Sequence, residues 1–256
     1  DRACKIEGEP AIEAAHWIAR SYLKEGRPAE ALAVVEAAIA KVDAKSPMLA
    51  ELELDRADAL YDTPERRKES VALYEKIAKD HADRRVGPQA AYMAGFAALG
   101  LGDYNAAHAH AGSFLKAHPD HELSADVIYV AAESNLQLGN YAQAEKLFRE
   151  LLEKYAGRAE SPTWKLRVAL CLQLADKHDE VVKTLGPWLG DFKTPEILAE
   201  AQFLLGASQF EQKQFGEASK SLSASLAAAP KWRRADESPL LLARSQRESG
   251  DGNASQ

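Results

Sequence analysis

The stretch LGDYNAA, residues 101–107, decides the fold, because the chain repeats its pattern as LGNYAQA at residues 138–144. Gly102 and Gly139 are thirty-seven residues apart, and equal steps continue along the chain if two inserted residues are allowed near its N-terminal end. The resulting anchor positions are Gly26, Glu65, Gly102, Gly139, Asp176, Lys213 and Gly250. A fixed period of this length indicates a protein built from stacked copies of one supersecondary unit.

Two further columns of residues keep a fixed distance from the anchors, and both are mostly small. Five residues after the anchors lie Ala31, Ser70, Ala107, Ala144, Val181 and Ala218. Seven residues before them lie Ala19, Asp58, Gly95, Ala132, Ala169, Gly206 and Ala243. Small residues on facing sides allow two antiparallel helices to approach closely. Each unit is therefore predicted to be a helix–turn–helix hairpin, with a large ring from Tyr104, Tyr141 or Phe215 beside the turn.

Composition agrees with helices that bury a core. Of the 256 residues, 46% are hydrophobic, and no long stretch alternates between apolar and polar residues as a strand would. Most Pro residues fall near expected helix starts or unit ends, where Pro is tolerated. Pro187 is the exception, because it falls inside the expected second helix of the fifth unit. We expect that helix to be shortened or broken at Gly186 and Pro187.

The segment AAYMAGFAALGLGDYNAAHAHAGSFLKAHPD, residues 90–120, resembles the tetratricopeptide repeat (TPR). It has that family's small residue in the first helix, LG-x-Y turn, Ala in the second helix and late Pro. The resemblance implies an all-α fold, a right-handed α-solenoid of about six and a half helix–turn–helix units. The expected single solenoid covers residues 1–252, before a disordered tail at 253–256. Its units are 10–46, 47–86, 87–123, 124–160, 161–193, 194–234 and a capping helix at 235–252.

The links between units are longer than in the usual repeat, as HPDHELSAD at residues 118–126 shows. This feature is similar to bacterial envelope TPR proteins of the outer-membrane assembly lipoprotein and Tol-Pal coordinator type. That similarity implies a location in the bacterial periplasm or cell envelope rather than in the cytoplasm.

Charge and hydropathy argue against several classes of partner. The formal net charge of −7 disfavours nucleic acid, which normally requires a clustered basic face. No apolar run approaches the roughly 20 residues that span a bilayer, so no direct membrane insertion is expected. The opening DRACKIEGEP lacks an initiator Met and a signal-like apolar core, so we expect a mature form or an excised fragment. Cys4 and Cys171 are expected to be free thiols, with Cys171 a small buried residue.

No constellation of residues predicts catalysis, a cofactor or a metal site. The densest group is His108, His110, His118 and His121, but the first two point to different sides of a helix and the others lie in an expected loop. SFLK at 113–116 resembles a Ser-Lys pair without the other motifs of such enzymes. Acidic residues at helical spacing are typical of solvated helix faces. We therefore expect a protein that is not an enzyme and binds no cofactor.

In the TPR family, the inner face of the first helices forms a concave groove that takes an extended or helical peptide. One row of this face, ten residues before the anchors, contains Asp55, Tyr92, Tyr129, Leu166, Phe203 and Leu240. The row four residues later contains Phe96, Glu133, Leu170, Ala207 and Arg244, and the first unit contributes His16, Arg20 and Lys24. The predicted partner-binding residues are Tyr92, Phe96, Tyr129, Glu133, Leu166, Leu170, Phe203, Arg244, His16 and Arg20. Of these, Tyr92, Tyr129 and Phe203 are the expected aromatic anchors.

Alternatives remain open for both the site and the function. Leu166 and Leu170 are also compatible with a core between neighbouring repeats, although the groove is the favoured interpretation. The favoured function is a non-enzymatic scaffold or adaptor that binds a protein or peptide on its concave face, with the oligomeric state undetermined. The alternatives are a structural subunit that associates with itself, and the TPR region of a larger protein whose activity lies outside these residues.

Overall fold

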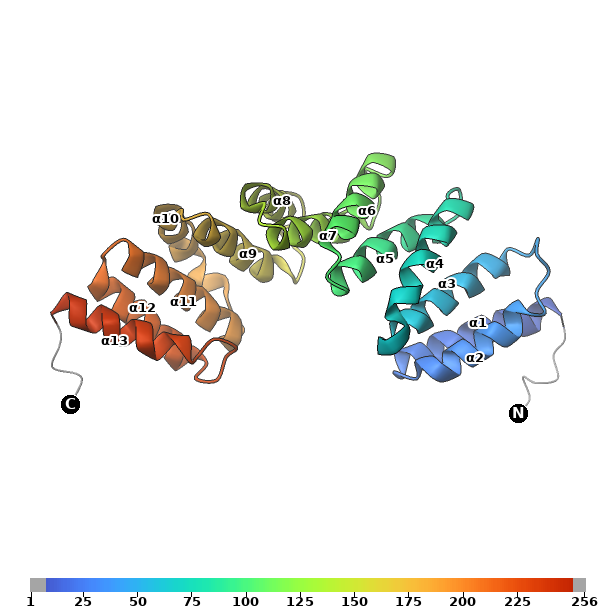
Figure 1. Cartoon of the computed structure of the whole chain (residues 1–256), viewed down its shortest axis with the longest axis horizontal. Coiled ribbons are helices and arrows are strands. Elements are labelled where there is room, and N and C mark those ends of the chain that lie inside the picture. Colours follow the sequence, from blue (N-terminus) through green and yellow to red (C-terminus); the bar gives the residue numbers. More distant parts are fainter. Residues whose placement is uncertain (1–7, 251–256) are drawn as a thin grey trace. The chain divides into compact units, whose positions relative to one another are not determined.

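The computed structural model describes residues 8–250, and every regular element in this range is a helix (Figure 1). The α-helices are α1 (Glu9–Lys24), α2 (Pro28–Ile39), α3 (Met48–Tyr61), α4 (Arg67–Asp80), α5 (Val86–Gly100), α6 (Tyr104–Ala117), α7 (Ser124–Gln137), α8 (Tyr141–Lys154), α9 (Ser161–Leu174), α10 (His178–Trp188), α11 (Pro195–Glu211), α12 (Phe215–Ala228) and α13 (Glu237–Ser249). Two short 3-10 helices, η2 (Pro64–Arg66) and η3 (Leu189–Asp191), follow α3 and α10. The predicted all-α class is confirmed. Cys4 and the expected tail at 253–256 lie outside the described residues.

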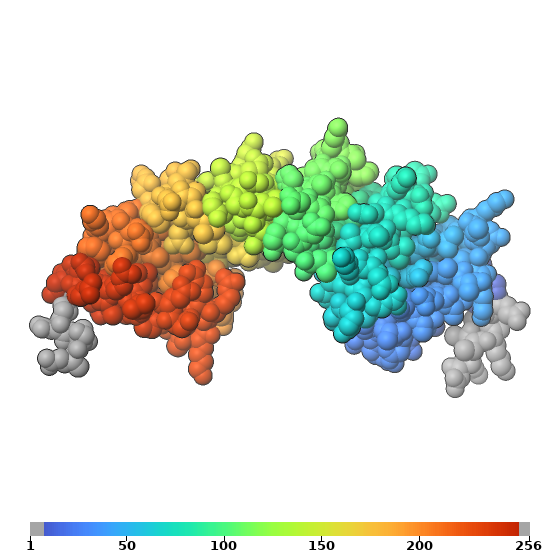
Figure 2. Space-filling model, viewed as in Figure 1, coloured from blue at the N-terminus to red at the C-terminus, as the bar shows by residue number. Residues whose placement is uncertain are grey.

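Contacts divide the chain into two compact units, residues 1–134 and residues 135–256. From α1 to α6 in the first unit, and from α8 to α13 in the second, each helix packs on the next one along the chain. The first helices of successive hairpins also contact one another, as α1–α3–α5 and as α9–α11–α13. Side chains close the gaps that the ribbons leave between these neighbours (Figure 2). Each unit is thus a stack of helical hairpins, while a single solenoid over residues 1–252 stays a prediction.

Turns with a left-handed backbone join the helices of most hairpins. The anchor residues with this conformation in these turns are Gly26 (φ 70°), Gly102 (φ 79°), Gly139 (φ 79°), Asp176 (φ 57°) and Lys213 (φ 61°), and the last anchor, Gly250 (φ 83°), adopts it after α13. Gly adopts this region readily because it has no Cβ, which explains why the anchor column is rich in Gly. The anchor Glu65 differs, because it lies in η2 rather than in such a turn.

The two columns of small residues mark the places where paired helices touch. All members of the column five residues after the anchors are buried. A Cβ added at Gly206 on α11 would lie 2.8 Å from Cγ of Leu222 on α12. A Cβ added at Gly95 on α5 would lie 3.3 Å from Cβ of His110 on α6. The close helix approach predicted from the small residues is therefore confirmed.

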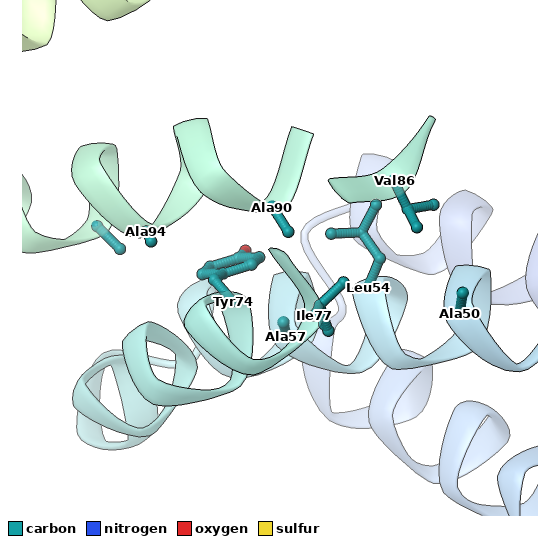
Figure 3. Packing of buried hydrophobic residues seen from close by; sticks show 9 residues of the cluster. Ala50, Leu54, Ala57, Tyr74, Ile77, Val86, Ala90 and Ala94 are labelled. Atoms are coloured by element: carbon teal, nitrogen blue, oxygen red, sulfur yellow. The ribbon is translucent and has the colours of Figure 1, made fainter. Parts of the chain in front are cut away.

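The core of the second hairpin shows how large and small residues alternate between helices (Figure 3). The fully buried ring of Tyr74 on α4 lies among Ala57 of α3 and Ala90 and Ala94 of α5. Small side chains on the flanking helices leave the volume that the ring occupies, as close packing requires.

The fifth hairpin has a short second helix. α10 has 11 residues, whereas α6, α8 and α12 each have 14. Pro187 lies in its last turn, and η3 replaces further α-helix after Trp188. Pro has no N–H to donate to the preceding turn, so the helix gains little by continuing. The predicted shortening is confirmed, although the helix is not broken before Pro187.

Two further observations bear on function. Cys171 on α9 is a buried thiol that forms no disulfide within residues 8–250, and its burial agrees with its apolar surroundings in the sequence. Within residues 8–250, none of the helices combines the length and the apolar character that crossing a bilayer requires.

Candidate protein-binding surface

The first helices of the second unit form a pocket of about 420 Å³. Side chains of α9, α11 and α13 line it, together with the turn after α9, the first residue of α10 and the loop before α13. Its apolar lining is Leu174, Phe203, Ala207 and Leu241, and its polar lining is Gln173, Asp176, His178, Glu211 and Arg234. We call this site the second-unit pocket. It contains Phe203 and Ala207, which belong to the two rows predicted from the sequence.

The apolar residues of the pocket differ in accessibility: Phe203 at its base is buried, and the residues around it are partly exposed. Phe203 is 3% exposed, and Trp232 from the loop before α13 packs against it with ring centroids 5.4 Å apart. Leu174, at the end of α9, is 44% exposed, and Ala207 and Leu241 are half-buried. An apolar side chain that entered the pocket would therefore contact Leu174, Ala207 and Leu241 rather than the bulk of the Phe203 ring.

The charged groups around the pocket differ in how fully they are paired. Arg234 donates two hydrogen bonds to the Glu237 carboxylate, at 2.6 and 2.7 Å, and its Cζ lies 4.6 Å from the centre of the Phe203 ring. The hydrogen bonds from Arg234 lower the pKa of Glu237. The Asp176 carboxylate is 96% exposed and lies 3.9 Å from His178, and Glu211 is exposed. The accessible rim of the pocket therefore carries two carboxylates, those of Asp176 and Glu211. The positive charge of Arg234 is paired with the carboxylate of Glu237.

The first unit presents a group of aromatic rings on α3 and α5. The ring of Phe96 lies 5.8 Å from that of Tyr92 and 6.0 Å from that of Tyr61. The guanidinium of Arg67 lies over the Tyr61 ring, with its Cζ 4.8 Å from the ring centre. All three rings are half-buried, so they present edges at the surface. Tyr92 and Phe96 thus lie together, as their spacing of one helical turn predicts.

His16 and Arg20, which the sequence predicted to lie at the charged rim of the groove, make contacts with α3. His16 Nδ1 lies 2.5 Å from Oδ2 of Asp55, and Arg20 donates a 2.7 Å hydrogen bond to Asp58. Asp55 is 1% exposed, and its burial raises its pKa to about 6, with the hydrogen bond from His16 opposing the shift. These side chains join α1 to α3. His16, which is largely covered, is therefore a contact between repeats rather than an open peptide-binding group.

Two apolar members of the predicted site are buried. Leu166 and Phe203 are each 3% exposed, so Leu166 belongs to the core and Phe203 forms the buried base of the second-unit pocket. Phe203 is covered because the loop before α13 folds back over it with Trp232 and Arg234. Leu170 is half-buried, one turn after Leu166 on α9. The alternative left open by the sequence, that such residues pack in the core, holds for Leu166.

The remaining predicted residues differ in accessibility. Tyr129 on α7 is half-buried, and Glu133 on the same helix is 7% exposed. Arg244 on α13 is exposed, and its Cζ lies 4.9 Å from the centre of the Phe210 ring. Their role in binding stays a prediction.

Sequence reasoning missed several pocket residues, although one extension of it identifies two of them. Leu174 and Glu211 lie four residues after Leu170 and Ala207, and they are again one period apart. A third row, one helical turn further along the first helices, would therefore have included both. Arg234 and Leu241 carry no such signal, because the fold of the loop before α13 brings them to the pocket.

The histidine-rich segment forms packing contacts. The rings of His118 and His121 lie 5.2 and 5.5 Å from the Phe114 ring, and His121 Nδ1 accepts a hydrogen bond from the Leu123 N–H. His110 Nε2 lies 3.1 Å from Glu75. Across residues 8–250, no three His, Cys, Asp or Glu side chains are grouped in a way that would hold a metal ion.

Comparison with known families supports the repeat interpretation. Residues 18–85 and residues 98–162 match two family models described as tetratricopeptide repeat, and together they span just over half of the chain. A comparison with curated protein sequences gave no match.

Solved structures with the same fold include several TPR proteins. A tetratricopeptide repeat protein from Parabacteroides merdae is 15% identical over 92% of this chain and 98% of its own, with a TM-score of 0.61. The C-terminal part of a TPR repeat-containing protein from Cytophaga hutchinsonii is 15% identical over 93% and 90%, with a TM-score of 0.69. YrrB, described as a TPR protein with an unusual peptide-binding site, is 16% identical over 75% and 92%, with a TM-score of 0.59. At these identities the likeness concerns the fold alone.

Proposed function

Because this chain is built from tetratricopeptide repeats, we propose that it is a non-enzymatic scaffold that binds a segment of a partner protein on the face formed by its first helices. TPR folds are typical of protein-interaction scaffolds. The proposal places this contact at the second-unit pocket, and the rings of Tyr92 and Phe96 on the first unit are a separate candidate surface. The description of YrrB as a peptide-binding TPR protein supports it by analogy of fold.

The observation that carries the proposal is the form of the second-unit pocket. It is a concave site with accessible apolar side chains from three helices and polar groups at its edge, which is the usual composition of a recognition site. The helices that line it pack on one another, so little ordering is needed before a partner binds. A partner segment would therefore gain apolar contact from Leu174, Ala207 and Leu241.

Filling the pocket tests this function. A phage-displayed library of random twelve-residue peptides is selected on the full chain and on the variant Ala207→Trp, in which an indole occupies the pocket. Ala227→Trp, at an exposed position of α12 outside the pocket, is the control. We expect peptides selected on the wild-type chain to bind the Ala227→Trp variant and to lose binding to Ala207→Trp. Equal binding to both variants contradicts the proposal, provided that circular dichroism shows both to be folded.

A second candidate function, self-association, is favoured by exposed apolar side chains on two helices. Trp17 on α1 is 62% exposed, and Leu240 on α13 is 69% exposed. Light scattering over a hundredfold range of protein concentration tests this candidate, and a monomeric mass throughout would exclude it. The location in a bacterial cell envelope also stays a prediction, and it follows from neither candidate.

A further inference from the structure

We propose that the segment bound in the second-unit pocket carries an aliphatic side chain next to a Lys or Arg, so that the partner is a basic–apolar peptide segment of another protein. This inference rests on the proposed function and adds the chemistry of the partner.

The shape and lining of the pocket favour an aliphatic side chain. Its accessible apolar residues, Leu174, Ala207 and Leu241, come from three different helices, so an inserted side chain would be in contact on several sides. Ala207 adds little bulk to this lining, because its side chain ends at Cβ. Burial of apolar surface at such a place is favourable, so one aliphatic side chain supplies part of the affinity.

The electrostatics of the rim favour a cation beside that side chain. Within the described residues, neither Glu211 nor Asp176 forms an ion pair with a Lys or Arg side chain, and the His178 imidazole lies 3.9 Å from Asp176. Arg234 does not neutralise these carboxylates, because its two hydrogen bonds go to Glu237. The rim therefore presents uncompensated negative charge to a ligand.

The two carboxylates are placed so that one bound segment could contact both of them. Asp176 belongs to the turn after α9, two residues after Leu174, and Glu211 lies on α11 one helical turn after Ala207. Each carboxylate is thus close in sequence to one of the apolar residues of the pocket, and both line the same pocket. A Lys or Arg adjacent to the inserted aliphatic residue would reach them. The net charge of −7 acts in the same direction, since it attracts basic partners and repels acidic ones.

The test uses the same peptide selection, now read for composition. Peptides selected on the wild-type chain are sequenced, synthesised and measured by fluorescence anisotropy against the full chain and two double variants. Asp176→Asn with Glu211→Gln removes the rim charges, and Asn tolerates the left-handed backbone of Asp176. Glu65→Gln with Glu153→Gln is the matched control, because it removes the same charge from exposed positions outside the pocket.

We expect the selected peptides to be enriched in Lys or Arg beside Leu, Ile, Val or Met. The rim variant should bind them about three- to tenfold more weakly, and the control within about twofold of the wild type, because solvent-exposed charge pairs contribute modestly. Raising the salt concentration should weaken binding to the wild type more than to the rim variant.

The outcomes separate this inference from the proposed function. If the peptides lose binding to Ala207→Trp but show no basic residues, or bind the rim variant as tightly as the control, the inference is wrong and the proposed function stands. Selection of acidic peptides would also overturn it. If no peptide distinguishes the wild type from Ala207→Trp, both proposals are wrong.

Discussion

The hydroxyl of Tyr74 on α4 donates a 2.7 Å hydrogen bond to Oδ1 of Asp58 on α3. Asp58 occupies the column in which other repeats have Ala or Gly, so the second hairpin has a polar contact at a position that is small and apolar elsewhere. Arg20 of α1 donates a second hydrogen bond, also 2.7 Å long, to the other oxygen of the same carboxylate. Burial raises the pKa of Asp58, and the hydrogen bond from Tyr74 opposes the shift. Asp58 thus connects three helices.

Tyr74→Phe should lower the free energy of unfolding by about 1–3 kcal/mol, because it removes a donor from a largely buried carboxylate and leaves the ring packing intact. Urea unfolding at pH 7 measures the change. Tyr104→Phe, at a half-buried tyrosine beside a turn, is the control and should change the value by less than about 0.5 kcal/mol. Equal effects of the two variants would show that the hydrogen bond adds nothing to stability.

Asp55 should make the free energy of unfolding decrease as pH rises, because burial raises the pKa of this carboxyl. Its pKa is raised to about 6 by burial, from about 4 in an unfolded chain, so the folded state holds the proton more tightly. The stability that this proton contributes is fully present below about pH 4 and is lost as pH rises through about 6. The wild type should therefore become less stable relative to Asp55→Asn over this interval. Urea unfolding of both proteins at pH 4, 5, 6 and 7 measures the difference, and a difference that does not vary with pH would contradict the assignment.

Gly206→Ala should destabilise the second unit, because the new Cβ would lie 2.8 Å from Cγ and 3.2 Å from the backbone N of Leu222. Leu222 is fully buried and cannot move aside without disturbing the core. We expect a loss of about 1–3 kcal/mol in the free energy of unfolding, measured by thermal or urea denaturation. Gly216→Ala on α12 is the control, since nothing lies within 4 Å of its added Cβ. Higher helix propensity should make that variant more stable by up to about 1 kcal/mol.

Lys213→Gly should stabilise the protein, although it removes the whole side chain. Lys213 has a left-handed backbone with φ 61°, which is unfavourable for a residue with a Cβ and readily adopted by Gly. We expect a gain of about 0.5–1 kcal/mol in the free energy of unfolding. Lys146→Gly, at an exposed position inside α8, should instead cost about 1 kcal/mol. A loss of stability at both positions would show that the turn at Lys213 is not strained.

The sequence predicted the local structure well because the relevant forces act between neighbours along the chain. The anchor column identified the left-handed turns at Gly102 and Gly139, and the small residues identified the helix contacts at Gly95 and Gly206. Pro187 located the short helix of the fifth hairpin. Each of these depends on backbone sterics or on one helix facing its partner within a hairpin.

The candidate site was predicted in part. The spacing placed Tyr92 beside Phe96, because residues one turn apart share a helix face whatever the rest of the fold does. It could not tell which residues of that face would stay accessible. Leu166 became core, and Leu174 became an accessible part of the pocket.

The sequence by itself determined the repeat, its turns and the helices that pair, since a thirty-seven-residue period and the steric demands of Gly and Ala are properties of the chain. Tertiary structure alone decided where charge and apolar surface remain available. The loop before α13 folds Trp232 and Arg234 over Phe203. Carboxylates of α3 pair with His16 and Arg20. Accessibility depends on what segments distant in sequence place over a residue, and a periodic pattern carries no information about them.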